Sequence, residues 1–351
     1  MSTNTVIDED KPRVIYLLTY PRTASNLLTH TLSLDQQSNI ISPWGGGYFF
    51  RSVVVNNTLP YSGKHVQSWT AEERAHGAKV YQSCYDDLCE WIDKARAEKK
   101  TLFVKEHLRF MVDPTALSAF VHGEDTVSEA PWSVQSPRDG WSPPIMAGDT
   151  HSRMNKTILP DRILAEGRHI ILIRHPALTV PSYYWAFVDI HGPEAVIQEE
   201  ASLMANVTIY WSRCVYEWLK SANASSDGVW PMVLDGDDII TNPQLLTELS
   251  ESTGMDSSKL QFEWSPASEV ELDRFPDKTM KRMRGTLFTS PGVMKHKAWN
   301  GDRRIEQEAR KWSDEFGDRG AEWIQKWIWK SMPDYDFLRE RRFLGKAGGN
   351  T

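Results

Sequence analysis

A short apolar run near the start of the chain, residues 14–18 (VIYLL), constrains the fold more than any other feature. Charged residues precede it and the pair Tyr20-Pro21 follows it. A continuous rather than alternating apolar run is typical of a strand that is buried on both faces of a sheet. Leu28 and Thr31 then continue a segment with helical spacing. The sequence therefore predicts a buried parallel strand, a tight loop and a helix.

The same alternation of buried strands and helices continues along the chain. Further apolar runs predict strands, which lie at residues 101–105, 169–173 and 230–235. Periodic apolar positions predict helices at residues 71–99, 176–188, 201–222, 242–252 and 302–330. Strands that alternate with helices imply a parallel sheet covered on both faces. We therefore expect an α/β fold of three layers, a parallel sheet flanked by helices, with a helical C-terminal extension.

No linker or internal repeat visibly divides the 351 residues of the sequence. We therefore expect one domain over residues 13–340, a flexible or disordered N-terminus at residues 1–12 and a flexible tail at residues 341–351. Two irregular segments lie inside this domain, at residues 42–70 and 121–158. The first sets glycines beside aromatic residues, and the second is rich in Pro, Gly, Ser and Asp. Long segments of this composition are usually functional loops or lids.

Composition and charge argue against several classes of partner. The formal net charge is −7, which disfavours broad binding to nucleic acid or to an anionic membrane, so any anion site must be built locally. Cys84, Cys89 and Cys214 are odd in number and lack the spacing of metal ligands, so we expect neither a disulfide framework nor a metal site. We find no apolar segment long enough for a signal peptide or a membrane span. These features predict a protein of the cytosol.

The loop after the first predicted strand, residues 19–27 (TYPRTASNL), has the composition of an anion site. It lies between a buried strand and a helix N-terminus, where backbone N–H groups and the helix dipole favour an anion. Arg22 supplies a cation, and three short polar side chains follow it. The P-loop motif G-x-x-x-x-G-K-[ST] is absent, which weakens the case for ATP-dependent phosphoryl transfer. A polar turn that merely caps its helix is the alternative interpretation.

The segment from Tyr20 to Asn26 (YPRTASN) resembles the 5′-phosphosulfate loop of sulfotransferases that use PAPS, adenosine 3′-phosphate 5′-phosphosulfate. That loop has a pattern close to Y/G-P-[KR]-S-G-T-T. Arg22 falls on the catalytic Lys or Arg position of the family, while Ala24 replaces its glycine and Asn26 its second threonine. The resemblance implies a P-loop NTPase-like sulfotransferase fold. It also implies that the cofactor is bound by Arg22, Thr23, Ala24, Ser25 and Asn26.

Residues 104–108 (VKEHL) resemble the K-T-H-L segment of cytosolic sulfotransferases. On a strand, Lys105 and His107 face the same side and Glu106 the opposite side. The resemblance implies that His107 is the general base, a role that suits an imidazole with an ordinary pKa of about 6.5. Lys105 would join Arg22 in stabilising charge on the bridging oxygen. Glu106 is a second candidate base, because some family members use a glutamate, and a purely structural His107 is the alternative.

Residues 174–184 (RHPALTVPSYY) resemble the 3′-phosphate signature of the same family. Arg174 would bind that phosphate in a forked geometry, and Ser182 would donate a further hydrogen bond. Pro181 predicts a kinked helix or a late helix start. The alternative is an arginine that only pairs with a surface carboxylate.

Farther along the chain, two segments compete for the basic loop that closes over the nucleotide in this family. They are residues 282–286 (RMRGT), with Arg284 and Gly285, and residues 290–295 (SPGVMK). Asp238 would be structural rather than catalytic.

Together these matches imply a PAPS-dependent sulfotransferase that transfers a sulfuryl group in line to a hydroxyl of a small acceptor, without a covalent intermediate or a metal. The chain has 15 tryptophans, and several aromatic residues lie in the segments expected on the acceptor side. A pocket for a phenol or an apolar alcohol follows as a hypothesis, with ordinary core packing as the alternative. The residues in question are Trp44, Tyr48, Phe49, Phe50, Trp132, Trp141 and Trp185.

Three other functions stay open at this point. The first is a P-loop kinase, the second a nucleotide-binding protein of the same fold without transferase activity, and the third a sulfation coupled to elimination. The sequence leaves the acceptor and the oligomeric state undetermined.

Overall fold

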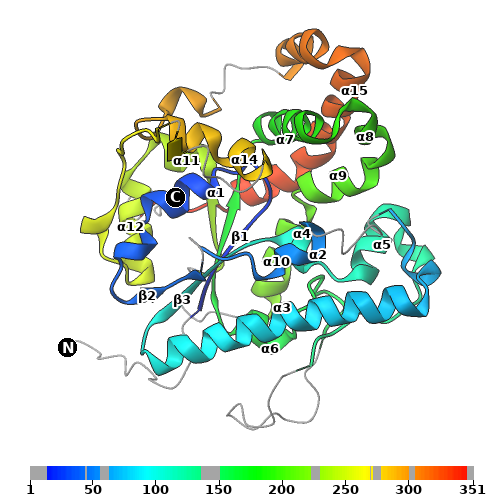
Figure 1. Ribbon diagram of the computed structural model, residues 1–351, viewed down its shortest axis with the longest axis horizontal. Helices are drawn as coiled ribbons and strands as arrows, with labels where there is room; N and C mark the ends of the chain where they lie inside the picture. Colours follow the sequence, from blue (N-terminus) through cyan, green and yellow to red (C-terminus); the bar gives the residue numbers. More distant parts are fainter. Residues whose placement is uncertain are drawn as a thin grey trace.

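A parallel sheet forms the centre of the protein in the computed structural model (Figure 1). The structure describes residues 14–43, 46–55, 63–135, 151–222, 230–268, 270–271, 278–299 and 305–345. Within these residues the sheet has five strands in the order β2-β3-β1-β4-β5, and every pairing is parallel. The strands are β1 (Val14–Thr19), β2 (Ile40–Ile41), β3 (Thr101–His107), β4 (Arg168–Ile173) and β5 (Met232–Asp235). The predicted α/β fold class is confirmed.

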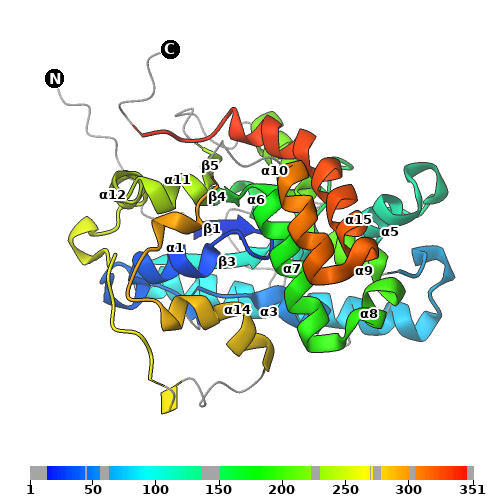
Figure 2. The same cartoon turned by 90° about the horizontal axis from the view of Figure 1, so that it is seen from above.

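Helices cover both faces of this sheet (Figures 1 and 2). Apolar clusters join the strands to α3, α6 and α10 on one face and to α1, α11 and α12 on the other. A further cluster unites α7, α9 and α15, which confirms the predicted helical C-terminus. None of the described helices is both long and apolar enough to cross a membrane. The described α-helices are α1 (Ser25–Thr31), α2 (Ser52–Val55), α3 (Ala71–Ala97), α4 (Leu108–Met111), α5 (Pro114–His122), α6 (Asp161–Ala165), α7 (Pro176–His191), α8 (Pro193–Gln198), α9 (Glu200–Val207), α10 (Tyr210–Ser221), α11 (Gly236–Thr241), α12 (Gln244–Thr253), α14 (Lys278–Thr289) and α15 (Ile305–Arg339).

The strand β1 shows why a continuous apolar run makes a doubly buried strand. Tyr16 and Leu18 belong to the apolar cluster that contains α3. Ile15 and Leu17 belong to the opposite cluster, where they pack with Leu28 of α1. Alternate side chains therefore meet apolar neighbours on both faces, and burying each large apolar side chain stabilises the fold by about 1.5–3 kcal/mol.

Residues 201–222 form two helices, α9 and α10, rather than the single helix predicted from the sequence. Thr208, between them, has an extended backbone, and its Oγ1 accepts a hydrogen bond from the backbone N of Tyr210 at 3.2 Å. That bond satisfies one of the N–H groups left open at the start of α10. The single helix was wrong because a local cap interrupts a continuous helical periodicity.

Sequence analysis left two possibilities for the helix that carries Ser182, a kinked helix or a start near Pro181, and the structure excludes the late start. α7 starts at Pro176, where a proline loses no helical hydrogen bond, and it continues through Pro181. The Nδ1 of His175 accepts a hydrogen bond from Ala177 N at 3.1 Å and caps this start. A start after Pro181 is therefore wrong, and Ser182 lies two turns inside the helix.

Candidate functional site

The carboxyl ends of three neighbouring strands carry the residues of the candidate site. Strand β1 lies between β3 and β4, so the loops that follow these strands meet at one edge of the sheet. Thr19 at the end of β1 pairs in register with His107 at the end of β3. The motifs around Arg22, Lys105 and Arg174 therefore follow adjacent strands.

The loop after β1 has a tight and partly strained backbone. Arg22 and Ala24 have φ angles of 72° and 70°, in the left-handed region, which costs a residue with a side chain about 1–2 kcal/mol. Thr23 is buried, and its Oγ1 donates a hydrogen bond to Tyr20 O at 3.1 Å. A Cβ added to Gly236, at the start of α11, would lie 2.6 Å from Thr23 O. The loop therefore packs against the end of β5 so closely that only glycine fits there.

Arg22 connects this loop to the helix that follows β4. Its Nε donates a hydrogen bond to Ser182 Oγ at 2.8 Å. Arg174, directly after β4, donates from Nε to Asp237 Oδ1 at 3.0 Å and from Nη2 to Lys297 O at 2.7 Å. Residues 160 positions apart in the sequence thus meet in one polar site.

Several cationic side chains gather around these two loops. Burial, followed by the nearby charges of Arg174 and Arg282, lowers the pKa of Arg22 to about 10. The pKa of Lys297 is also lowered, first by burial and then by Arg174 and Arg22. Arg282 lies with its Nε 3.4 Å from Asp189 Oδ2. Like charges held this close repel one another, so the arrangement favours a bound polyanion. We call Arg22, Arg174, Arg282 and Lys297 the cation cluster.

Lys105 is a buried cation at the edge of the same site. Its side chain is 1% exposed, and its Nζ donates a hydrogen bond to Asn26 Oδ1 at 2.6 Å. Burial and then the charge of Arg284 lower the pKa of Lys105 to about 7, although Glu106 acts in the opposite direction. Near neutral pH this ammonium therefore changes its protonation state readily, and a neighbouring anion would keep it charged.

His107 forms hydrogen bonds through both ring nitrogens. Its Nδ1 lies 2.6 Å from Thr19 Oγ1, and its Nε2 lies 3.3 Å from the hydroxyl of Tyr48. Burial and then the charge of Lys105 lower the pKa of His107 to about 3. The imidazole is therefore neutral at physiological pH and can accept a proton, but its pKa lies well below the value of about 6.5 expected from the sequence, which makes it a weaker base in the free protein.

Glu106 lies between Lys105 and His107 in the sequence and contacts a different segment. Its buried Oε1 accepts a hydrogen bond from Phe50 N at 3.0 Å. Burial is the main cause that raises the pKa of Glu106 to about 8. Since Glu106 holds the backbone of the segment at residues 49–51, it has a structural contact that His107 lacks.

Arg284 and Gly285 lie on α14, which contacts both α1 and α7. Arg284 is near enough to Lys105 to lower its pKa, as Arg282 does for Arg22. A Cβ added to Gly285 would meet no atom within 4 Å. In the competing segment at residues 290–295, Gly292 forms a bridge to Glu263. The structure thus brings the 282–286 segment to the cation cluster.

Comparison with known proteins gives two full-length relatives. The chain is 37% identical over 353 residues to the sulfotransferase ppzF of Metarhizium majus (strain ARSEF 297), covering 97% of this chain and 99% of the relative. It is 36% identical over 349 residues to the sulfotransferase ppzF of Metarhizium rileyi (strain RCEF 4871), covering 96% and 98%. The chain belongs to the sulfotransferase family. No protein-family model matches this sulfotransferase.

Two solved structures are similar to this sulfotransferase at a much greater distance. The sulfotransferase domain of the Synechococcus PCC 7002 olefin synthase gives a TM-score of 0.34 at 13% identity, covering 88% of this chain and 96% of that domain. The sulfotransferase domain from the curacin biosynthetic pathway gives a TM-score of 0.35 at 12% identity, covering 87% and 97%. At these values neither structure adds to the family assignment.

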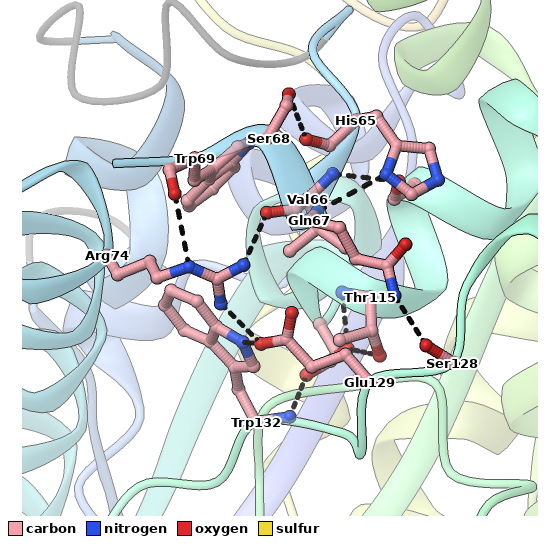
Figure 3. A network of polar contacts seen from close by, with 12 residues as sticks. His65, Val66, Gln67, Ser68, Trp69, Arg74, Thr115, Ser128, Glu129 and Trp132 are labelled. Atoms are coloured by element: carbon pink, nitrogen blue, oxygen red, sulfur yellow. Dashed lines mark hydrogen bonds and ion pairs between the residues drawn. The ribbon is translucent and has the colours of Figure 1, made fainter. Parts of the chain in front are cut away.

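Among the aromatic residues singled out in the sequence, Trp132 belongs to a polar network at the start of α3 (Figure 3). Its indole Nε1 donates a hydrogen bond to Glu129 Oε1 at 2.8 Å, and the same oxygen accepts one from Arg74 Nη1 at 2.6 Å. The ring meets Trp69 edge-on, with 5.5 Å between ring centroids. These contacts fasten two irregular segments to α3, so Trp132 has a packing role in this sulfotransferase.

The other aromatic residues divide into four groups. Phe49 and Phe50 are buried in the core, and Trp44 and Trp141 lie outside the described residues. Trp185 is 37% exposed on α7 and lies under the guanidinium of Arg282. Tyr48 faces His107, with 4.9 Å between ring centroids.

Sequence analysis missed two neighbours of the predicted residues in this sulfotransferase. Lys297 was signalled only by the basic run at residues 295–297 (KHK), which the motif comparison did not include. Thr19 carried no signal of its own, because its hydroxyl becomes relevant only through the pairing of β1 with β3. Among the described residues, no group of three or more His, Cys, Asp and Glu side chains is arranged to hold a metal ion.

Proposed function

We propose that this sulfotransferase uses PAPS as its donor and transfers the sulfuryl group to a hydroxyl of a small acceptor. The hydrogen bond from Arg22 to Ser182 is the observation that carries the proposal. PAPS carries anionic groups at both ends of its ribose, and this bond joins the loop after β1 to the helix after β4. One molecule with two anionic ends would contact both the loop after β1 and the helix after β4.

Each end of the donor has a matching group of residues in the proposal. The 3′-phosphate would be bound by Arg174 and Ser182, with Lys297 close to both loops. The 5′-phosphosulfate would be bound by the backbone of the loop at residues 22–26, by the Arg22 guanidinium and by Lys105. The mutual repulsion within the cation cluster supports this assignment, because a polyanion would relieve it.

The chemical step follows from these roles. The acceptor oxygen attacks sulfur and forms a new O–S bond, while the bond between sulfur and the bridging phosphate oxygen breaks and leaves its electron pair on phosphate. Arg22 and Lys105 would stabilise that developing charge, since an arginine with a pKa near 10 stays cationic at neutral pH. His107 would receive the proton of the acceptor hydroxyl.

For the acceptor, we propose a small molecule whose hydroxyl belongs to an aromatic or otherwise apolar group. Tyr48 and Phe110 lie beside His107, with ring-centroid distances of 4.9 Å and 5.3 Å. Aromatic walls favour apolar ligands. A screen of hydroxyl compounds that yields only highly charged sugars as products would contradict this part of the proposal.

Calorimetry with adenosine 3′,5′-bisphosphate, the product of the donor, tests the nucleotide assignment. We expect the bisphosphate to bind more tightly than ATP with Mg²⁺, because the site provides cations for two separated phosphate groups. A preference for ATP would favour a kinase. Mass spectrometry of products from PAPS and a panel of alcohols and phenols would distinguish a sulfated product from an alkene formed by elimination, and bound nucleotide without any product would indicate a binding protein.

We also expect the protein to take up protons when it binds the bisphosphate. In the free protein the pKa of Lys105 is lowered to about 7, so a large fraction of Lys105 is neutral at pH 7.5. A bound phosphate favours the charged form and raises this pKa, so binding at pH 7.5 should consume up to about one proton.

Calorimetry in buffers of different ionisation enthalpy measures that number at pH 7.5. The replacement Lys105→Met keeps the apolar length of the side chain and should abolish the uptake. Equal proton uptake by this variant would show that another group titrates.

A further inference from the structure

A chain of hydrogen bonds runs through the ring of His107. On one side, Nδ1 lies 2.6 Å from Thr19 Oγ1, and Thr19 Oγ1 donates to the carbonyl oxygen of Glu106 at 3.4 Å. On the other side, Nε2 lies 3.3 Å from the Tyr48 hydroxyl. Burial is the main cause that raises the pKa of Tyr48, and Ser25, close to this hydroxyl, acts in the opposite direction. The chain thus extends from the loop after β1 to the end of β3.

The direction of each hydrogen bond in this chain follows from the number of protons available. The Thr19 hydroxyl has a single proton, and when it donates that proton to the Glu106 carbonyl oxygen at 3.4 Å it accepts from His107 Nδ1 at 2.6 Å. In this arrangement the proton of the neutral imidazole lies on Nδ1, which leaves the lone pair of Nε2 to accept from the Tyr48 hydroxyl. Both ring nitrogens are satisfied in this tautomer.

Tyr48 is held firmly in front of Nε2. Its backbone N donates to Lys105 O at 2.9 Å, and the preceding Gly47 forms a bridge with Lys105. The ring lies 5.9 Å from that of Phe110, and the ammonium of Lys105 lies 4.9 Å from the Tyr48 ring centroid. These contacts therefore keep the Tyr48 hydroxyl within hydrogen-bonding distance of Nε2.

From this arrangement we propose that Thr19 fixes the Nδ1-protonated tautomer of His107 and that Tyr48 passes the proton of the acceptor to Nε2. The inference rests on the proposed function for the role of His107 as base. As the new O–S bond forms, the acceptor proton moves to the Tyr48 oxygen while the Tyr48 proton moves to Nε2. Tyr48 ends neutral, His107 ends as an imidazolium, and its Nδ1 proton stays hydrogen-bonded to Thr19.

The tautomer is directly measurable, without donor or acceptor, from ¹⁵N–¹H correlation spectra of the histidine rings. We expect His107 to show a protonated Nδ1 and an unprotonated Nε2. The replacement Thr19→Val is nearly isosteric at this fully buried position and removes the hydroxyl, so the ring should change to the Nε2-protonated form or to a mixture. Thr19→Ser restores a hydroxyl and should restore the original spectrum. An unchanged tautomer in Thr19→Val would overturn the role of Thr19.

The relay through Tyr48 is measurable with water as the acceptor, as the release of sulfate from radiolabelled PAPS. Tyr48→Phe keeps the ring and removes the hydroxyl, and we expect release to slow by about tenfold or more, since a positioned proton-transfer group contributes about 10²–10⁴-fold. Adenosine 3′,5′-bisphosphate should bind with unchanged affinity. Equal or faster release of sulfate by Tyr48→Phe would overturn the relay and would mean that Tyr48 only limits the access of water. If the unmodified protein failed to bind the bisphosphate, the proposed function would be wrong. The histidine ring spectra would still determine the tautomer of His107 in that case.

Discussion

Replacing His107 by asparagine is expected to lower the kcat of sulfuryl transfer by about 10²–10⁴-fold, the usual contribution of a general base. The amide nitrogen of asparagine can still donate to Thr19, as Nδ1 does at 2.6 Å. The variant has no counterpart of Nε2, so no side-chain nitrogen is left there to accept the proton of the acceptor hydroxyl. Single-turnover rates with radiolabelled PAPS and an acceptor found by screening measure the effect.

Two further measurements separate catalysis from folding and binding in this variant. The affinity for adenosine 3′,5′-bisphosphate should stay within about twofold, because His107 makes no contact with the cation cluster in the proposal. His76→Asn, at an exposed position on α3, is the matched control and should keep full activity. An unchanged kcat in His107→Asn would mean that another group is the base. Glu106→Gln would then be the next variant to measure.

Replacing Arg174 by glutamine is expected to weaken binding of adenosine 3′,5′-bisphosphate by about 30-fold to several thousandfold, because loss of one partner from a desolvated charge pair costs about 2–5 kcal/mol. Arg174 has the hydrogen-bond donors that a phosphate requires, and its Nε is bonded to Asp237 in the free protein. Calorimetry gives the affinity, and Arg153→Gln at an exposed position is the matched control. Unchanged tight binding by Arg174→Gln would remove the 3′-phosphate assignment.

The loss of Arg174 also leaves the carboxylate of Asp237 without this partner, which could unfold part of the site. Asp237→Asn separates the two effects, because it removes the negative charge and keeps the arginine. In this variant we expect binding to tighten by a few-fold, since a carboxylate 3.0 Å from the guanidinium competes with the phosphate. Weaker binding in Asp237→Asn, with an unchanged melting temperature, would mean that Asp237 positions Arg174 instead of competing for it.

Four strands could be predicted from the sequence because each contains a continuous apolar run, of four or more residues in β1 and β4 and of three in β3 and β5. Strand β2 was missed, since its two residues, Ile40 and Ile41, are too short to form a pattern. The helix break at Thr208 was missed for a different reason. Apolar periodicity continued across it, but Thr208 has an extended backbone after α9 and its hydroxyl bonds to the start of α10. Long patterns were thus predictable, and single local contacts were not.

The candidate site divides in the same way. Arg22, Lys105 and Arg174 each follow a strand in a short motif, so sequence alone could name them and the sheet order brings their loops together. The hydrogen bonds of His107 to its hydroxyl neighbours could not be predicted, because Thr19 and Tyr48 lie 88 and 59 positions away in the sequence. Their relevance arises only when β1 pairs with β3 and the segment after β2 folds against Lys105.

Left-handed residues at Arg22 and Ala24 flank Thr23 in the loop after β1. A turn of this kind aims consecutive peptide N–H groups into a common hollow, which is itself an anion receptor. In the proposed function, recognition of the tetrahedral anion would then reside largely in the main chain. Ala24 would then occupy its left-handed position, at a cost of about 1–2 kcal/mol, without loss of the main-chain N–H groups that contact the anion.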